Sequence, residues 1–415
     1  MAGLDPRALS TYLHYGYFPR VPEGFAELPW ARVRRADVLR PGDVAREELV
    51  ARGLRAMQAA CAEPGPGLHV VPLSGGLDSR FLLAVLLELV PRADLRTVTF
   101  GVPGALDFEL AEGVARAAGV AHERLDLTRL RVTRAELDAT ARRAPWGFVF
   151  EAHFNHEIPR RFGADATYWS GIMANVTIGK DLDFPETSWA ASCREFAGRS
   201  RLLRGRALVA PGFDPAAVLP REPILADGAL AHLEQLYAFL RFPGRLDAAL
   251  LAEGSRWRTP FRTAAWNDCM LRAPRELRAD PGFYRAIAAR SNPALFALPT
   301  KNDLGLAPGA GTLRRRARGL GHKLVRAVNR LAPGRMPRVN PSLNYADLDG
   351  ELRAASDLGR VIETALEALA RRAALPWLDP LELLARHRAR RENLGEHLAL
   401  LASLEVHLAR EELGA

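Results

Sequence analysis

The chain has 415 residues, of which 48% are hydrophobic and 25% charged, and its formal net charge at pH 7 is +9. This composition is ordinary for a folded globular protein and argues against disorder. No basic leader precedes an apolar core, and no apolar run approaches the roughly 18 residues needed to cross a bilayer, so we expect neither secretion nor membrane insertion. Three widely spaced cysteines support no disulfide framework or zinc site and fit a cytoplasmic protein.

The first 62 residues are expected to form a lead-in segment and a helix. An aromatic stretch at residues 12–19 is followed by prolines, which indicates a short helix and then extended chain. Residues 44–62 have helical periodicity and are expected to pack beside the first strand.

Strand-like runs then follow at separations suited to parallel crossovers. They are residues 69–73, 95–100, 122–127 and 164–169. Helical patterns at 80–89 and 107–118 lie between the first three runs. The alternation predicts an α/β core over residues 63–190, with a doubly wound parallel sheet and a ligand at the carboxyl ends of its strands.

The segment Ser74-Gly75-Gly76-Leu77-Asp78-Ser79 joins the first strand to the first crossover helix. A glycine-rich turn of this kind exposes backbone N–H groups, and the positive end of the helix dipole adds to them. Phosphate can therefore bind there, and ATP is the expected ligand. The spacing fits neither a Walker loop nor a dinucleotide loop, so the turn belongs to another phosphate-binding class.

Asp78 extends this prediction to a metal ion. A carboxylate beside phosphate oxygens is repulsive unless a divalent cation lies between them, and Mg²⁺ is the expected one. The alternative is an ordinary turn in which a serine caps the helix.

From about residue 190 onward helical signals dominate, and residues 191–415 are expected to be a mainly helical part packed on the sheet. The densest basic stretch runs from Arg314 through Lys323, Arg326, Arg330 and Arg335 to Arg338. It is either a nucleic-acid patch or a solvated helix face with an apolar stripe formed by Leu320, Leu324, Val328 and Leu331. The absence of interleaved aromatic residues favours the helix face, so nucleic acid is not the expected partner.

Several motifs, taken in chain order, resemble one known family. Residues 73–80 resemble the pyrophosphate-binding loop of the asparagine synthetase family, whose synthetase domain adenylates a carboxylate and passes it to an amine. Similar pieces follow at residues 99–107, 169–171, 257–261 and 298–303. The resemblance implies a PP-loop-type α/β fold with a large helical C-terminal portion.

The resemblance also implies roles for individual residues. The backbone of Phe100 would contact adenine, and Gly171 would lie beside the ribose and α-phosphate. Lys301 matches the catalytic lysine of the family. Lys301 is one of only three lysines, with Lys180 and Lys323, in an arginine-rich chain. The implied nucleotide-binding set is Leu73, Ser74, Gly75, Gly76, Asp78, Ser79, Phe100, Ser170 and Gly171.

The sequence departs from the family pattern in three places. The family members that make asparagine carry a glutaminase domain with an N-terminal cysteine, whereas this chain begins where that domain would end. Ile172 replaces a glutamate that acts as general base, and Asn175 replaces a metal-binding aspartate, although its carbonyl oxygen can still coordinate Mg²⁺. Arg262 follows Phe261, where the family has leucine and aspartate.

Three hypotheses follow from these residues. The first is an ATP-dependent ligase that joins a small-molecule or peptide carboxylate to an amine or ammonia. The second is a catalytically degenerate nucleotide-binding protein or partner subunit, which Ile172, Asn175 and Arg262 favour. The third is an RNA-modifying enzyme, suggested by the net positive charge.

Overall fold

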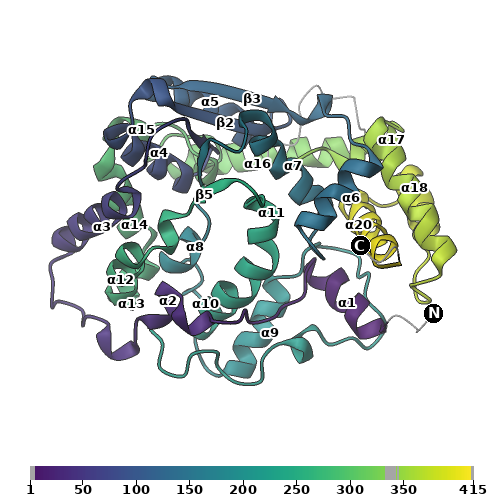
Figure 1. Cartoon of the computed structure of the whole chain (residues 1–415), viewed down its shortest axis with the longest axis horizontal. Helices are drawn as coiled ribbons and strands as arrows, with labels where there is room; N and C mark the ends of the chain where they lie inside the picture. The colour runs from purple at the N-terminus through teal and green to yellow at the C-terminus, as the bar shows by residue number, and fades with distance from the viewer. Residues whose placement is uncertain (1–4, 332–342, 344, 413–415) are drawn as a thin grey trace.

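The computed structural model describes residues 5–331, 343 and 345–412. A five-stranded sheet has the order β3-β2-β1-β4-β5, and all of its neighbouring strands pair in parallel. Strands β2, β3 and β5 are labelled in the upper half of Figure 1. The strands are β1 (His69–Pro72), β2 (Leu95–Gly101), β3 (Ala121–Asp126), β4 (Thr167–Trp169) and β5 (Arg256–Arg258). The predicted α/β fold with a doubly wound parallel sheet is confirmed.

Strand β1 is the point at which the order of strands reverses. The chain runs from β1 outward to β2 and β3, then returns to place β4 and β5 on the other side of β1. In open parallel sheets a ligand binds beyond the carboxyl ends of the strands at such a switch point. The loop that follows β1 therefore lies where the topology favours a binding site.

The strand β5 was not expected from the sequence. It pairs in parallel with β4, with Tyr168 opposite Trp257, so the second half of the chain completes the sheet. Its three residues include two arginines and are largely accessible, and a strand this short gives no apolar alternation to detect.

Adjacent residues of β1 point to opposite faces of the sheet, as strand geometry requires. Val71 belongs to the apolar cluster on the face covered by α3 (Arg46–Cys61), α4 (Asp78–Leu89) and α5 (Leu106–Ala118). The helices α12 (Ala264–Arg272), α13 (Arg275–Ala279), α14 (Pro281–Ser291) and α15 (Pro293–Phe296) extend this layer.

Val70 faces the other way and packs with Ile158 of α7 (Val149–Phe162). Beyond α7, a second apolar cluster joins α6 to the C-terminal helices, which lie together at the right of Figure 1. These elements are α6 (Arg134–Arg143), α17 (Leu348–Arg353), α18 (Asp357–Arg372), α19 (Pro380–Arg388) and α20 (Gly395–Glu412).

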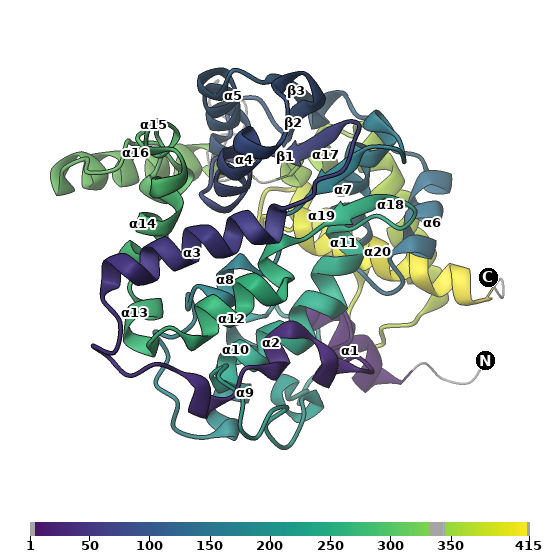
Figure 2. The same cartoon turned by 60° about the vertical axis from the view of Figure 1, so that its left-hand side comes forward.

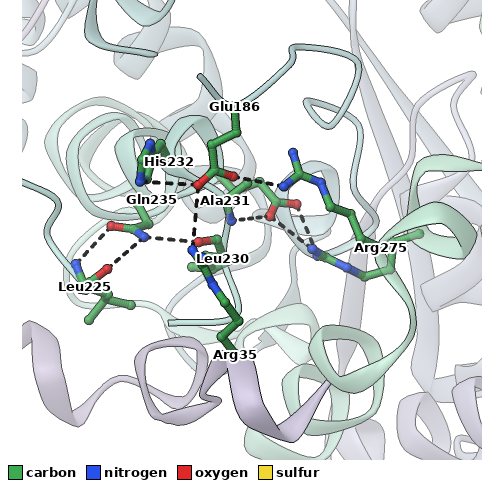
Figure 3. Close-up of polar contacts among 10 residues, drawn as sticks. Arg35, Glu186, Leu225, Leu230, Ala231, His232, Gln235 and Arg275 are labelled. Carbon is green, nitrogen blue, oxygen red and sulfur yellow. Dashed lines mark hydrogen bonds and ion pairs between the residues drawn. The ribbon is translucent and has the colours of Figure 1, made fainter. Parts of the chain in front are cut away.

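A third layer lies below the sheet in Figure 1. Its elements are α1 (Pro6–Tyr15), α2 (Pro29–Arg32), α8 (Ala174–Thr177), α9 (Trp189–Arg199), α10 (His232–Leu236), the π-helical segment η6 (Tyr237–Asp247) and α11 (Ala248–Leu250). Figure 3 shows the polar network that ties this layer together. The Glu186 carboxylate lies 2.9 Å from Arg275, 3.3 Å from His232 and 3.7 Å from Arg35, so one half-buried anion holds three chain segments.

The basic stretch begins with the helix α16 (Thr312–Leu331), which extends away from neighbouring helices (Figure 2). Leu320 and Leu324 of the predicted apolar stripe are 67% and 61% exposed, so this part of the stripe is not packed. Arg335 and Arg338 lie outside the described residues, as do the side chains of Arg326, Arg330 and Leu331. Among the helices of residues 5–331 and 345–412, none combines the length and apolar character needed to span a membrane.

Candidate functional site

The turn after β1 is compact and leaves the start of α4 uncapped by a side chain. Leu77 occupies the N-cap position and makes no capping hydrogen bond, so no serine caps this helix. Instead, the hydroxyl of Ser79 accepts a hydrogen bond from the Ser74 amide (3.1 Å), and the hydroxyl of Ser74 accepts one from the Gly76 amide (3.2 Å). The first N–H groups of α4 are therefore free of side-chain caps, which suits an anion.

The glycines of this region lie close to neighbouring chain segments. A Cβ at Gly75 would lie 3.1 Å from Leu110 of α5, and one at Gly76 would lie 3.4 Å from the Cε atom of Lys301. A Cβ at Gly171 would lie 3.2 Å from that of Asp78. The end of β4, the first turn of α4 and the Lys301 segment thus approach one another closely.

Arg80 positions the segment that leads to Lys301. Its fully buried guanidinium donates hydrogen bonds to the carbonyl oxygens of Leu295 (3.0 Å), Leu298 (3.1 Å) and Pro299 (2.8 Å). Burial lowers the pKa of Arg80 to about 10, which leaves the group charged at neutral pH. A helix that begins at the phosphate turn therefore also fixes a distant segment of the chain.

Asp107 connects Lys301 directly to the turn. One of its carboxylate oxygens accepts a hydrogen bond from the Gly75 amide (2.8 Å), and the other lies 2.8 Å from the Nζ atom of Lys301. The Lys301 amide in turn donates to the Gly75 carbonyl oxygen (2.9 Å). The Lys301 side chain is 40% exposed, so its ammonium group lies beside the turn and remains accessible.

The residues predicted to hold Mg²⁺ fit that role. Burial raises the pKa of Asp78, while a hydrogen bond from the Tyr284 hydroxyl and the Lys301 and Lys180 ammonium groups oppose the rise. Tyr284 occupies Oδ1 at 2.8 Å, and Oδ2 has no hydrogen-bond partner among the described residues. Asn175, at the start of α8, is exposed at the same cavity. One or two oxygen ligands suffice for a Mg²⁺ that keeps phosphate and water ligands.

These residues surround one cavity of about 560 Å³ at the carboxyl ends of β1, β2 and β4. The volume is in the range of ligand-binding sites. Gly75 and Gly76 complete the turn beside it. The predicted site residues that line the cavity are Leu73, Ser74, Asp78, Ser79, Phe100, Ser170, Gly171, Asn175 and Lys301.

The opposite wall of the cavity was not predicted. Its centre is an ion pair between Glu151 of α7 and Arg245 of η6, whose side chains are 6% and 15% exposed. The guanidinium donates two hydrogen bonds to the carboxylate, at 3.0 and 3.2 Å. The Tyr345 hydroxyl donates to the same carboxylate (3.3 Å), and its ring stacks on Phe100 at 5.7 Å.

Two departures from the family pattern have structural explanations. Ile172 is buried in the apolar cluster of the lower layer while also bordering the cavity, so no carboxylate occupies that position. Arg262 pairs with Asp247 at the end of η6, and its guanidinium lies 5.9 Å from the ring centre of Trp30. Arg262 thus anchors the cavity wall to the N-terminal segment.

The sheet and the uncapped glycine turn at its switch point define an α/β protein of the PP-loop type. Residues 70–154 match the asparagine synthase family, which confirms the sequence resemblance over the part of the chain that contains the turn. At the level of the family, this match supports an asparagine synthetase-like ligase that uses ATP. No curated protein matches the chain.

Sequence reasoning named the phosphate turn but missed the residues that organise it. Arg80 and Asp107 lay within the motifs that carried the resemblance, and their charge beside a glycine turn was an available signal. Glu151, Arg245 and Tyr345 gave no such signal, since each lies in an otherwise ordinary helical or loop segment.

Proposed function

We propose that the protein is an ATP-dependent ligase that forms an amide bond between a carboxylate and an amine or ammonia. ATP would bind with its phosphates along the turn from Ser74 to Ser79, with Phe100 toward adenine and Gly171 near the α-phosphate. The observation that supports the proposal most is the convergence of Asp78, Lys301 and the uncapped start of α4 on one cavity.

The chemistry requires two displacements. In the first, a carboxylate oxygen of the acyl substrate attacks the α-phosphorus of ATP, and the bond to pyrophosphate breaks. In the second, the amine attacks the acyl carbon of the adenylate, AMP leaves, and the amine proton passes to solvent. Both steps depend on positioning and charge neutralisation more than on covalent help from the protein.

The described residues supply the neutralisation. The Lys301 ammonium is held at the turn by Asp107, where it would face oxygen atoms that gain negative charge. Asp78 and Asn175 would hold Mg²⁺, which when bound screens the charge of the phosphates. Nothing in the proposed first step needs the general base that is missing at Ile172.

A pyrophosphate-release assay tests this proposal. Purified protein is given ATP, MgCl₂ and a panel of carboxylates and amines, and the rate is compared with that of Lys301→Ala. Removal of a preorganised charge at the reacting centre typically costs about 10²–10³-fold in rate, and we expect a loss of that size. Lys323→Ala, on the exposed face of α16, is the matched control and should keep the full rate.

Calorimetry of ATP with Mg²⁺ tests the nucleotide site separately. Asp78→Ala should weaken Mg²⁺-dependent binding about tenfold or more, because a charged ligand to the cation is lost. Asp126→Ala removes a half-buried carboxylate at the end of β3 that does not line the cavity, and this variant should bind ATP as the wild type does. Equal affinity in Asp78→Ala would refute the role proposed for Asp78.

The burial of Ile172 in an apolar cluster favours a second candidate, a catalytically degenerate nucleotide-binding or partner-binding protein. The two candidates differ in one measurement. If ATP binds but no carboxylate and amine in a broad panel yield pyrophosphate, the protein is a nucleotide-binding protein without ligase activity.

A further inference from the structure

The segment η6 forms much of the cavity wall that faces the nucleotide turn. It is π-helical over Tyr237–Asp247 and presents Arg241, Phe242, Arg245 and Leu246 to the cavity. Long-range ion pairs hold its C-terminal half, through Arg245 to α7 and through Asp247 to Arg262. π-helical turns are rare and frequently occur at functional sites. The π-helical conformation of η6 therefore indicates that this wall of the cavity has a function.

The basic side chains of the cavity differ in how they are paired. Within the described part of the chain, three line it: Arg241, Arg245 and Lys301. Arg245 is neutralised by Glu151, and Lys301 is paired with Asp107. Arg241 has no carboxylate partner among the described residues, and its guanidinium instead packs over the ring of Tyr237 at 5.5 Å.

The surroundings of Arg241 on this wall are apolar. Phe242 is buried, and Leu246, Leu250 and Trp257 are half-buried, and all four line the cavity. Arg241 is half-buried at the cavity, and the Tyr237 ring leaves its hydrogen-bond donors without a carboxylate among the described residues. A carboxylate that enters the cavity would pair with this charge, and the planar guanidinium can bind it through two parallel hydrogen bonds.

We propose that Arg241 binds the carboxylate of the acyl substrate and that the substrate carries an apolar or aromatic body against Phe242, Leu246, Leu250 and Trp257. This inference rests on the ligase function proposed above and names its substrate class. Lys301 and the start of α4 serve the phosphates of ATP, so a second anion in the same cavity needs a cation of its own, and Arg241 provides it. The substrate carboxylate is thereby held in the cavity that receives the α-phosphate.

Binding of a simple probe tests the assignment without requiring turnover. The probe is 3-phenylpropanoate, titrated in the presence of MgCl₂ and α,β-methylene-ATP, which cannot release pyrophosphate, and observed by saturation-transfer NMR. The neutral amide 3-phenylpropanamide has the same body without the charge. We expect the acid to bind the wild type and to bind Arg241→Gln about 10–100-fold more weakly, as fits the loss of one bidentate charged contact. The amide should not distinguish the two proteins.

Arg20→Gln is the matched control, because Arg20 is an exposed arginine that packs over the Phe18 ring at 5.6 Å away from the cavity. This variant should bind the acid as the wild type does. The inference is overturned if Arg241→Gln binds the acid unchanged, or if the wild type binds neither acid nor amide while the nucleotide analogue binds. Failure of the analogue to bind the wild type would instead refute the proposed function, and the same titration without nucleotide then decides whether Arg241 binds carboxylates.

Discussion

The two walls of the cavity are built in different ways. The phosphate wall is built around one contiguous turn, in which backbone amides donate hydrogen bonds to the hydroxyls of Ser74 and Ser79 and glycines permit close approach. The opposite wall comes from α7, η6 and the segment at Tyr345, which are far apart in the sequence and are joined by buried ionic and aromatic contacts. The first wall is specified locally, whereas the second exists only once the chain has folded.

This difference separates a general function from a specific one. A turn that binds the phosphates of ATP has the same task whichever acyl substrate is activated. Its residues therefore follow a short pattern that can be recognised in the sequence. The facing wall would select the acyl partner and is free to vary with it. We therefore expect substitutions in the second wall to affect stability and substrate choice, and those in the first to affect nucleotide binding and turnover.

The strongest test of this contrast is Glu151→Gln. The variant leaves the Arg245 guanidinium largely buried without its counter-charge, and removal of one partner of a buried ion pair costs about 3–5 kcal/mol. Urea denaturation should show a loss of this size. The control Glu27→Gln breaks the exposed pair with Arg32 and should change stability by less than about 1 kcal/mol. A small effect of Glu151→Gln would mean that the second wall does not depend on this pair.

The sequence allowed the sheet and its turn to be predicted because the relevant signals are local. The strands at His69–Pro72 and Leu95–Gly101 are apolar runs flanked by turn residues, and the helix at Leu106–Ala118 has clear periodicity. The strand at Arg256–Arg258 has none of these features. Its pairing with β4 is set by the packing of the second half of the chain, which no local pattern records.

The candidate site divides in the same way. The residues from Ser74 to Ser79 lie in one motif and were placed correctly at the end of a strand. The contact of Lys301 with that motif depends on Arg80, whose three hydrogen bonds reach a segment more than two hundred residues away. Such a contact arises from tertiary structure, and only the family resemblance had pointed to Lys301.

Arg80→Met tests whether this link between the two segments is structural alone. The change leaves three backbone carbonyl oxygens without their charged donor, and we expect a loss of about 2–4 kcal/mol in unfolding free energy. Because Lys301 follows these carbonyl groups, kcat for pyrophosphate release should fall more than the KM for ATP rises. Arg92→Met, which removes a single partly buried hydrogen bond to the Ala118 carbonyl oxygen, is the control. Equal changes in kcat and KM would argue against a positioning role.

Acidification should weaken the second wall through the histidines of α7. Burial lowers the pKa of both His153 and His156 to about 4, so between pH 6.5 and 4 the unfolded chain binds protons that the folded one does not. Stability is then fully present above pH 6.5 and falls as the pH decreases toward 4, by about 2 kcal/mol per histidine between pH 7 and 5. Urea denaturation at both pH values should show this loss, and His153→Gln should show a smaller one. An unchanged pH dependence in the variant would contradict the assignment to His153.

The smallest expected effect concerns the phosphate wall. Asp107→Asn keeps an oxygen for the Gly75 amide but removes the charge that pairs with Lys301, and because that pair is partly exposed, stability should change by less than about 1 kcal/mol. Loss of a negative charge beside the phosphates should tighten ATP binding severalfold at low salt, and the gain should shrink as salt screens it. The matched control is Asp126→Asn, because Asp126 also accepts a hydrogen bond from a backbone amide and pairs with an exposed arginine. Asp126 lies on the edge strand β3, so this variant should leave the affinity for ATP unchanged. If Asp107→Asn instead weakens ATP binding as much as Lys301→Ala does, then Asp107 acts chiefly by orienting the lysine, and the phosphate wall depends on a tertiary contact as much as the wall opposite.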